Sequence, residues 1–303
     1  MNYCILCGRN VESEGNYHKL CLKNLFGVNY WPKINLALDE VSIKAQKMVG
    51  KMSISGVQAK LSIRLDRANK ELEIVAKGGE YILKPQISTF PNIPQNENLC
   101  MNIALNLGIL VPPHSLIQLK DSSWAYIVKR FDRTNRKKIH QEDFCQILNE
   151  ENKYRGSLEK IGDKLWKISE VPGLDIQYFF ERILFFFIIG NGDAHLKNFS
   201  IIYDEKGHIR LSPAYDIISS KLVIPDEEDF ALSMNGKKNK ITNMDFEKLA
   251  KTLKIRSGAS YRKILGKISL INNFIEKDLY LRADEKKKLL AIVKERASRF
   301  NID

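Results

Sequence analysis

Apolar and polar residues alternate in short segments along the first half of the chain. Such alternation puts every second side chain on the same face and predicts strands with one buried face. The segments expected to form strands are 61–65, 71–75, 81–85, 115–119 and 125–129. Helical spacing occurs at 39–49 and at 96–107, where Gly108 closes the second helix. The first half is therefore expected to be rich in strands.

Helical spacing dominates from about residue 143 to the C-terminus. The expected helices cover 143–148, 176–189 and several segments after residue 245. Between them, 200–203 and 208–211 are predicted to pair across the turn that separates them. The longest apolar run, around 184–189, is far below the roughly 18 residues needed to cross a bilayer, so no membrane association is expected.

A polar loop after this apolar run carries the most informative residues. Asp193 and Asn198 stand five residues apart in it, and Asp216 follows between apolar residues. Kinases use one carboxylate to accept the substrate hydroxyl proton, an asparagine on a metal ion, and a second carboxylate that holds metal against the phosphates. The catalytic loop of protein kinases also spaces its Asp and Asn five apart. This order predicts a phosphoryl-transfer site, with an ordinary polar turn as the alternative.

Two features of the strand-rich half fit phosphate binding. The segment 53–60 lies directly before a strand and contains Gly56, which permits close approach of backbone N–H groups to a phosphate. Lys84 lies on a later strand, where protein kinases place a lysine that contacts the nucleotide phosphates. A plain turn and a surface lysine are the respective alternatives. The order of glycine loop, strand lysine and catalytic loop matches that of a kinase.

The predicted fold class is α+β. We expect a two-lobed protein-kinase-like fold, with a strand-rich N-lobe, a helical C-lobe and a small N-terminal Cys/His knuckle. A length of 303 residues suits two domains or one bilobal unit. The predicted domains are the knuckle at 1–30, the kinase N-lobe at 31–131 and the helical C-lobe at 132–303.

The N-terminal segment contains four candidate metal ligands. Cys4 and Cys7 form one close pair, and His18 and Cys21 form a second. Two close pairs of such ligands are typical of a structural tetrahedral zinc site, and a segment this short would need one to hold its shape. The alternative is a pair of reduced cysteines on a small hairpin without metal, with the histidine as a turn residue.

Charge and cysteine content indicate which partners and which cellular location to expect. The net charge is +12, and the last 67 residues hold 18 Lys and Arg against 8 Asp and Glu. A basic surface favours acidic partners, but these lysines alternate with apolar residues at helical spacing, which indicates a solvated helix face. No direct DNA binding is therefore expected. Five cysteines argue against a disulfide framework, and the N-terminus lacks secretory features, so a cytoplasmic location is expected.

Several segments together resemble one family. These segments are 53–60, 81–85, 128–133, 191–200 and 212–217. The combination of Gly-Asp-x-His-x-x-Asn-Phe with Pro-x-Tyr-Asp is fairly specific. On these motifs the chain resembles the HipA-type serine/threonine kinases, the toxin components of bacterial toxin–antitoxin modules.

The resemblance implies a role for each matching residue. Asp193 would accept the hydroxyl proton as the catalytic residue, and Asn198 and Asp216 would hold magnesium. The segment 55–60 would bind the phosphates, and 129–131 would form the hinge against which adenine lies. The residues implied to contact ATP are Ser55, Gly56, Val57, Gln58, Ala59, Lys60, Lys84, Lys129, Arg130, Phe131, His195, Lys197, Asn198, Tyr215 and Asp216.

The resemblance also implies substrates and partners. Family members phosphorylate aminoacyl-tRNA synthetases, which stops translation and growth and produces persistence, and they autophosphorylate on a serine that matches Ser53. This chain has a further serine, Ser55, where longer members have a small apolar residue. It also begins with the knuckle in place of an N-terminal subdomain, like the shorter toxins of three-component systems. Antitoxin proteins are therefore expected partners: a small protein supplying the missing subdomain and a DNA-binding antitoxin.

Two other functions remain open from the sequence. One is a small-molecule kinase of similar layout. The other is a nucleic-acid-binding regulator without enzymatic activity, built on the knuckle and the basic C-terminal helices.

Overall fold

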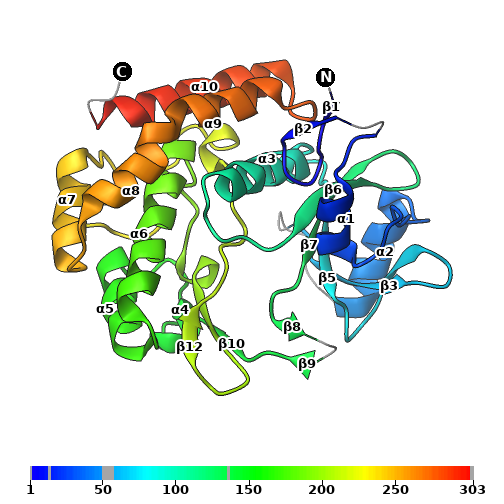
Figure 1. Cartoon of the computed structure of the whole chain (residues 1–303), viewed down its shortest axis with the longest axis horizontal. Helices are drawn as coiled ribbons and strands as arrows, with labels where there is room; N and C mark the ends of the chain where they lie inside the picture. The colour runs from blue at the N-terminus through cyan, green and yellow to red at the C-terminus, as the bar shows by residue number, and fades with distance from the viewer. Residues whose placement is uncertain (1, 13–14, 50–57, 135–136, 301–303) are drawn as a thin grey trace. The chain divides into compact units, whose positions relative to one another are not determined.

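The computed structural model describes residues 2–12, 15–49, 58–134 and 137–300. These form two compact units, each with its own internal packing (Figure 1). Unit 1 comprises Met1–Asn102, Pro112–Lys137 and Asp278–Leu281, and unit 2 comprises Ile103–Val111, Lys138–Lys277 and Arg282–Asp303. The predicted phosphate loop falls partly outside the described residues. The residues concerned are Ser53, Ser55, Gly56 and Val57.

Unit 1 contains a five-stranded antiparallel sheet with strand order β4-β3-β5-β7-β6. The strands are β3 (Leu61–Asp66), β4 (Glu71–Ile74), β5 (Tyr81–Pro85), β6 (His114–Gln118) and β7 (Trp124–Lys129). The predicted alternation is confirmed in β3, where Leu61, Ile63 and Leu65 are buried and the residues between them are more exposed. β5 is the central strand, so Lys84 lies in the middle of the sheet.

The Cys/His segment packs into the core of unit 1. It consists of β1 (Asn2–Tyr3), β2 (Asn10–Val11) and α1 (Lys19–Phe26). Cys4, Ile5 and Leu6 are buried in the same apolar cluster as Leu61 and Ile117 of the sheet. The unit also contains α2 (Leu38–Val49) and most of α3 (Ile93–Asn106), and α3 begins three residues earlier than predicted.

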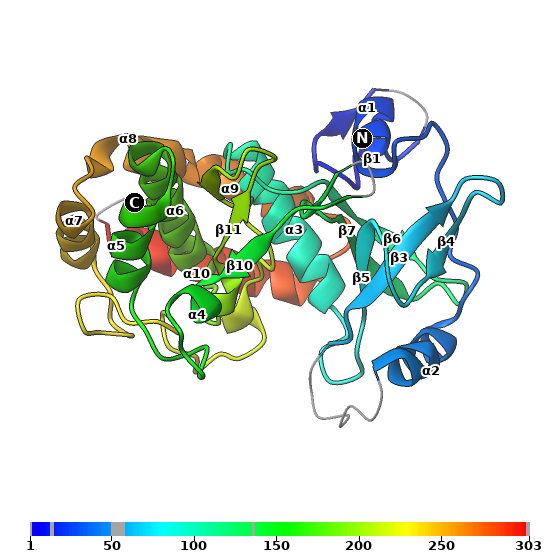
Figure 2. The ribbon, with the colours of Figure 1, turned by 90° about the horizontal axis from the view of Figure 1, so that it is seen from below.

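Unit 2 is organised around α6 (Pro172–Ile189), which contacts α5 (Leu158–Ile168), α8 (Ser257–Ile264) and α10 (Ala283–Ser298) (Figure 2). Every residue of the 179–189 stretch is buried, including Glu181 and Arg182, as expected of a largely apolar helix that other elements surround. The helix predicted at 176–189 is confirmed and extended by one turn, because Pro172 fits the first helical turn.

The remaining elements of unit 2 are short strands and peripheral helices. They are β10 (Gln141–Asp143), α4 (Phe144–Ile147), β11 (Ser200–Tyr203), β12 (Ile209–Leu211), α7 (Asn243–Thr252) and α9 (Ile268–Lys277). The predicted hairpin is confirmed as β11 and β12. The helix predicted at 143–148 is wrong at its start, because Asp143 ends β10 and its side chain caps α4. No helix in the described residues is long and apolar enough to span a bilayer.

Candidate active site

The end of α6 sets the position of the predicted catalytic loop. Gly190 adopts a left-handed conformation with φ of 69°, and its N–H bonds back to the carbonyls of Phe186 and Phe187. Asn191 N–H also donates to the Phe186 carbonyl at 2.8 Å. This glycine cap satisfies the last carbonyls of the helix and turns the chain sharply. Asp193 therefore follows directly from a rigid, buried helix.

A second loop lies close against the two glycines of this turn. A Cβ atom on Gly190 would stand 2.9 Å from Cγ2 of Ile292, and one on Gly192 would stand 2.5 Å from Oε2 of Glu227 and from the Glu228 carbonyl. Lys221 N–H donates to the Gly190 carbonyl at 3.0 Å. Any side chain at position 192 would displace the 227–228 backbone, and one at position 190 would meet Ile292 of α10, so both positions require glycine.

Asp193 is held by two neighbours that the sequence did not indicate. The Tyr154 hydroxyl donates to Asp193 Oδ1 at 3.0 Å, and the Asp193 N–H donates to Ser220 Oγ at 3.2 Å. Ser220 in turn donates to the Glu227 carboxylate at 2.5 Å. Burial raises the pKa of Glu227, and the negative charge of Asp193 adds to this effect. Asp193 is thus fixed at its backbone and at one carboxylate oxygen.

The other residues predicted in this loop are fixed by local hydrogen bonds. Asn198 Oδ1 accepts from the backbone N–H of His195 at 3.0 Å, and the Tyr215 hydroxyl donates to the Lys197 carbonyl at 2.9 Å. An amide oxygen has two lone pairs, so Asn198 can accept this bond and still bind a cation. Lys197 itself is exposed. The hydrogen bond from Tyr215 therefore links the loop to the segment that carries Asp216.

Asp216 has a backbone conformation that is uncommon for a residue with a side chain. Its φ is 54°, in the left-handed region. α6 anchors the strand before it: Asp175 accepts from Leu211 N–H at 2.9 Å, and Arg182 donates to the Ser212 carbonyl. Strained backbone that is held by its surroundings is concentrated at functional sites. Other polar residues, such as Asn149 and Asn235, share this conformation, so it sets the direction of the Asp216 carboxylate and does not by itself mark a functional residue.

The electrostatics of His195 connect the predicted residues. Burial lowers the pKa of His195, and the positive charge of Lys153 lowers it further. The carboxylates of Asp193 and Asp216 act in the opposite direction. Both carboxylates are therefore close enough to affect the same imidazole, and Asp193, His195 and Asp216 belong to one acidic site on unit 2.

Unit 1 contains a buried ion pair at the predicted phosphate-contacting lysine. Lys84 Nζ lies 2.6 Å from Oε1 of Glu97 on α3, and the two residues are only 4% and 2% exposed. The ammonium also lies 5.4 Å from the centre of the Tyr126 ring. A strand lysine paired with a glutamate on the following helix is the arrangement that protein kinases need for activity. Glu97 was not identified from the sequence.

The other residues predicted to bind nucleotide in unit 1 differ in their hydrogen bonds and in their exposure. Gln58 Nε2 donates to the Pro85 carbonyl at 2.8 Å, which ties the end of the predicted phosphate loop to the Lys84 strand. Lys129 Nζ donates to the Asn24 carbonyl at 3.2 Å. Arg130 makes two hydrogen bonds to Asp132, at 2.8 and 2.7 Å. Ala59 and Phe131 are half-buried and Lys60 is exposed. The two hinge cations thus bind protein groups.

The four candidate metal ligands of the knuckle converge. One ligand atom from each of Cys4, Cys7, His18 and Cys21 lies within 4.8 Å of all the others. His18 Nδ1 is 3.4 Å from Cys7 Sγ and 3.8 Å from Cys21 Sγ, and its Nε2 is 2.9 Å from the Asn10 carbonyl. A histidine whose second nitrogen binds a carbonyl is oriented as metal ligands usually are. This arrangement favours a ligand role for His18 over that of a turn residue.

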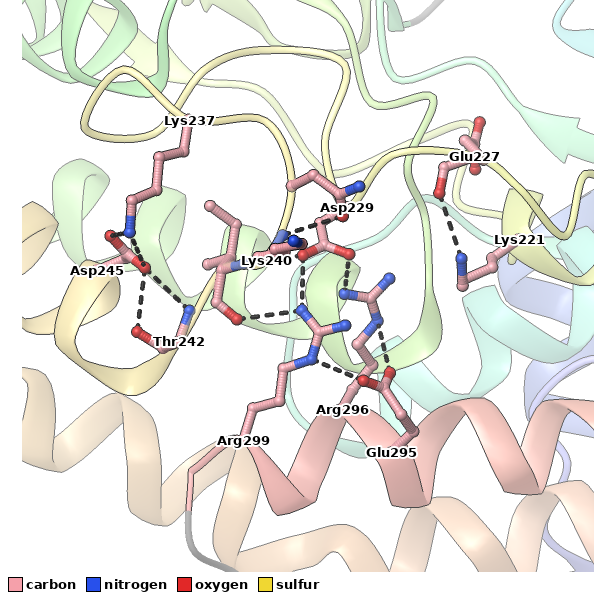
Figure 3. Close-up of polar contacts among 12 residues, drawn as sticks. Lys221, Glu227, Asp229, Lys237, Lys240, Thr242, Asp245, Glu295, Arg296 and Arg299 are labelled. Carbon is pink, nitrogen blue, oxygen red and sulfur yellow. Dashed lines mark hydrogen bonds and ion pairs between the residues drawn. The ribbon is translucent and has the colours of Figure 1, made fainter.

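A buried ion-pair network anchors the loop that carries Glu227. Figure 3 shows Asp229 in ion pairs with Arg296 and Arg299, which lie at the C-terminal end of α10. Asp229 and Arg296 are 2% and 1% exposed, and Asp229 also accepts from Ile241 N–H at 2.9 Å. The Arg296 guanidinium lies 4.7 Å from the centre of the Phe187 ring on α6. The loop facing Asp193 is therefore fixed to two helices.

Comparison with known proteins identifies the class and then the family. The fold is that of kinases: HipA of Shewanella oneidensis, solved as a toxin–antitoxin complex with HipB and operator DNA, superposes with a TM-score of 0.70 at 20% identity, covering 88% of this chain and 72% of that one. The proinflammatory kinase CtkA of Helicobacter pylori gives a TM-score of 0.55 at 16% identity, covering 83% and 91%. The HipA-like C-terminal domain matches residues 52–273, so the chain belongs to that family.

Curated relatives agree with this assignment. Y4dM of Sinorhizobium fredii, named as a candidate kinase, is 34% identical over 217 residues, which is 66% of this chain and 53% of that protein. A candidate kinase of Haemophilus influenzae is 32% identical over 194 residues, covering 59% and 55%. The chain spans about half the length of these relatives. The Cys/His knuckle lies before the part that the family matches.

For the phosphoryl-transfer site that the sequence predicts, replacing Tyr154 with phenylalanine is expected to lower the turnover number about tenfold without changing the KM for ATP. Burial and the Asp193 charge raise the pKa of Tyr154 to about 12, so its hydroxyl stays protonated and donates to Asp193. A hydrogen bond to a charged group contributes roughly 1.5–3 kcal/mol, and the 42% exposure of Tyr154 favours the lower end. Tyr203→Phe removes a hydroxyl bond of the same kind, from the hairpin residue Tyr203 to Glu142 on β10, and should leave both constants unchanged.

Proposed function

We propose that this chain is an ATP- and magnesium-dependent kinase that phosphorylates serine or threonine hydroxyls of proteins. The observation that carries the proposal is the acidic site of unit 2. Asp193 is held at the end of a buried helix, and the charges of Asp193 and Asp216 both act on His195. A fixed carboxylate beside a second carboxylate with metal-binding potential is what phosphoryl transfer requires.

Each group has a part in the proposed reaction. Asp193 would accept the proton of the attacking hydroxyl, and Asn198 and Asp216 would hold Mg²⁺, which would supply positive charge against the phosphates. Lys84, oriented by Glu97, contacts the phosphates together with the 55–60 loop. Lys129, Arg130 and Phe131 form the adenine hinge, and His195, Lys197 and Tyr215 flank the nucleotide. Because the side chains of Lys129 and Arg130 bind protein groups, the hinge would act through its backbone and Phe131.

We further propose that the kinase is the toxin of a toxin–antitoxin module, with an aminoacyl-tRNA synthetase as its substrate. Membership of the HipA-like family supports this, as does the fold shared with a HipA that was solved with HipB and operator DNA. Antitoxin partners would then include a DNA-binding protein and a small protein that supplies an N-terminal subdomain. Phosphoproteomics on cells expressing the chain, compared with cells expressing an Asp193→Asn variant, would identify the phosphorylated protein.

The Cys/His cluster is proposed to hold one structural zinc ion. Three thiols and one imidazole at mutual distances below 4.8 Å supply the four ligands of a closed tetrahedral site. Thiolate ligands must lose their protons to bind metal, so zinc binding by this cluster should weaken as the pH falls. Elemental analysis of the purified protein tests this occupancy.

Autophosphorylation is the expected result that tests the proposed kinase. After incubation with ATP and Mg²⁺, mass spectrometry should find phosphate on the peptide that contains Ser53 and Ser55, and none in the Asp193→Asn variant. A phosphate carries roughly 1.5 to 2 negative charges and three strong acceptors, so beside Gly56 it would compete with ATP for the loop N–H groups. Both serines lie outside the described residues. An unmodified peptide from enzyme that phosphorylates another protein would rule out this regulation.

A further inference from the structure

The turn between the first two candidate metal ligands contacts α3. Ile5, which lies between Cys4 and Cys7, accepts a hydrogen bond at its carbonyl from Asn98 Nδ2 at 3.3 Å. The N–H of Ile5 donates to the Asn16 carbonyl at 2.9 Å, so the turn is held at both backbone atoms. Ile5 and Asn98 are both buried, at 4% and 1% exposure. The contact is therefore shielded from water, and breaking it would leave buried polar groups unpaired.

Asn98, the α3 residue in this contact, directly follows Glu97 in the sequence. Glu97 Oε1 lies 2.6 Å from Lys84 Nζ. One helical turn further along α3, Asn102 Oδ1 lies 3.2 Å from Nε2 of the buried His114 on β6. The part of α3 in unit 1 is thus fixed by three polar contacts: to the knuckle, to β5 and to β6. Since Asn98 and Glu97 are consecutive, a shift of the helix that loses one contact also disturbs the other.

The knuckle has little regular structure of its own, although its apolar side chains pack into the core of unit 1. Its elements are two strands of two residues each and one helix of eight residues. Elements this short are marginal in water, and small metal-binding modules commonly fold only with the ion bound. Three of the four ligand residues act on the turn that contains Ile5. Cys4 and Cys7 lie on either side of Ile5, and the His18 N–H donates to Cys4 Sγ at 3.4 Å.

We propose that the metal bound by Cys4, Cys7, His18 and Cys21 holds α3 in the position in which Glu97 pairs with Lys84. Loss of the metal would release the turn at Ile5, loosen Asn98 and weaken the ion pair that orients the phosphate-contacting lysine. Its effect on ATP rests on the proposed kinase function. The metal site is thereby a control point for nucleotide binding as well as a support for the fold.

The test compares the full-length protein as purified, after treatment with 1,10-phenanthroline, and after zinc chloride is added back. Elemental analysis should give about one zinc per chain before treatment. Hydrogen–deuterium exchange of the 93–102 amides should rise at least tenfold on removal of zinc and recover on its return. Exchange in α6 serves as the internal control and should not change. The proposal would be overturned if the purified protein contained less than about one zinc per chain, or if the exchange rate of the α3 amides were the same with and without zinc.

Variants separate the metal site from the contact that transmits its effect. Cys7→Ser should lose zinc and show the fast α3 exchange, whereas Cys145→Ser, which alters another buried thiol on α4, should do neither. Asn98→Ala should keep one zinc but show fast α3 exchange. Normal exchange in Asn98→Ala would refute the coupling through Ile5, and this arm remains decisive if Cys7→Ser does not fold.

Binding of ATP and Mg²⁺, measured by calorimetry, separates this inference from the proposed function. The dissociation constant for ATP should rise at least tenfold in the zinc-free protein. If zinc controls α3 exchange but neither form binds ATP, the kinase proposal fails while the structural link stands. If both forms bind ATP equally and α3 exchange is unchanged, the link fails while the kinase proposal stands.

Discussion

Replacing Asp193 with asparagine is expected to reduce phosphoryl transfer by about 10²- to 10⁴-fold, the usual contribution of a general base. Asparagine has almost the same shape but cannot accept the proton of the attacking hydroxyl. Tyr154 can still donate to the remaining oxygen, and the backbone bond to Ser220 is untouched, so the fold should persist. Transfer of labelled phosphate from ATP measures the loss, and the melting temperature should stay within a degree or so of the wild type.

The matched control is Asp204→Asn, the same change at an exposed hairpin position of the same unit, where the carboxylate binds His208. It should keep full activity. Asp216→Asn should be as inactive as Asp193→Asn but should differ in magnesium dependence, because it removes a proposed metal ligand and not the base. Near-normal transfer by Asp193→Asn would refute the assignment of the catalytic residue.

Most elements were predictable because their signals are local. Alternation identified the strands of the unit 1 sheet, and the apolar run with a terminal glycine identified α6 and the loop after it. α5 was missed although Leu158, Ile161 and Leu165 have helical spacing, since Gly162 usually weakens a helix. The structure explains this glycine: a Cβ there would lie 2.1 Å from Cδ2 of Leu253.

The partners of the site residues were not predictable because they depend on tertiary contacts. Tyr154 and Glu227 lie 39 residues before and 34 residues after Asp193 along the chain, on loops without periodicity. Glu97 had a usable signal, since kinase chemistry calls for an acidic residue on the helix after the strand lysine. The segment 96–107 was predicted as that helix, and Glu97 is its only acidic residue.

Replacing Asp229 with asparagine is expected to lower the free energy of unfolding of unit 2 by about 3–5 kcal/mol, the usual effect of removing one partner from a buried ion pair. Arg296 is 1% exposed, so its charge would lose its buried counter-ion and keep only Glu295, a half-exposed carboxylate 3.3 Å from its Nε. Arg299 Nη1, 2.6 Å from the same carboxylate, would lose this ion pair and keep its bond to the Ile241 carbonyl, while its Nε still pairs with Glu295. Urea unfolding followed by circular dichroism measures the change.

Asp284→Asn is the control, because it removes a carboxylate from an exposed pair with Arg282 at the start of α10 and should leave the urea midpoint nearly unchanged. The pH dependence gives a further check. Burial alone would raise the pKa of Asp229, but its hydrogen bond from Ile241 and the two arginines outweigh burial and lower it. A carboxyl with a lowered folded-state pKa stabilises the fold above its unfolded pKa and loses this contribution as the pH falls through the folded pKa. The difference between wild type and Asp229→Asn should therefore be full at neutral pH and shrink on acidification. A difference that stays constant down to the acid-unfolding range would mean that the asparagine acts through packing and not through the lost charge.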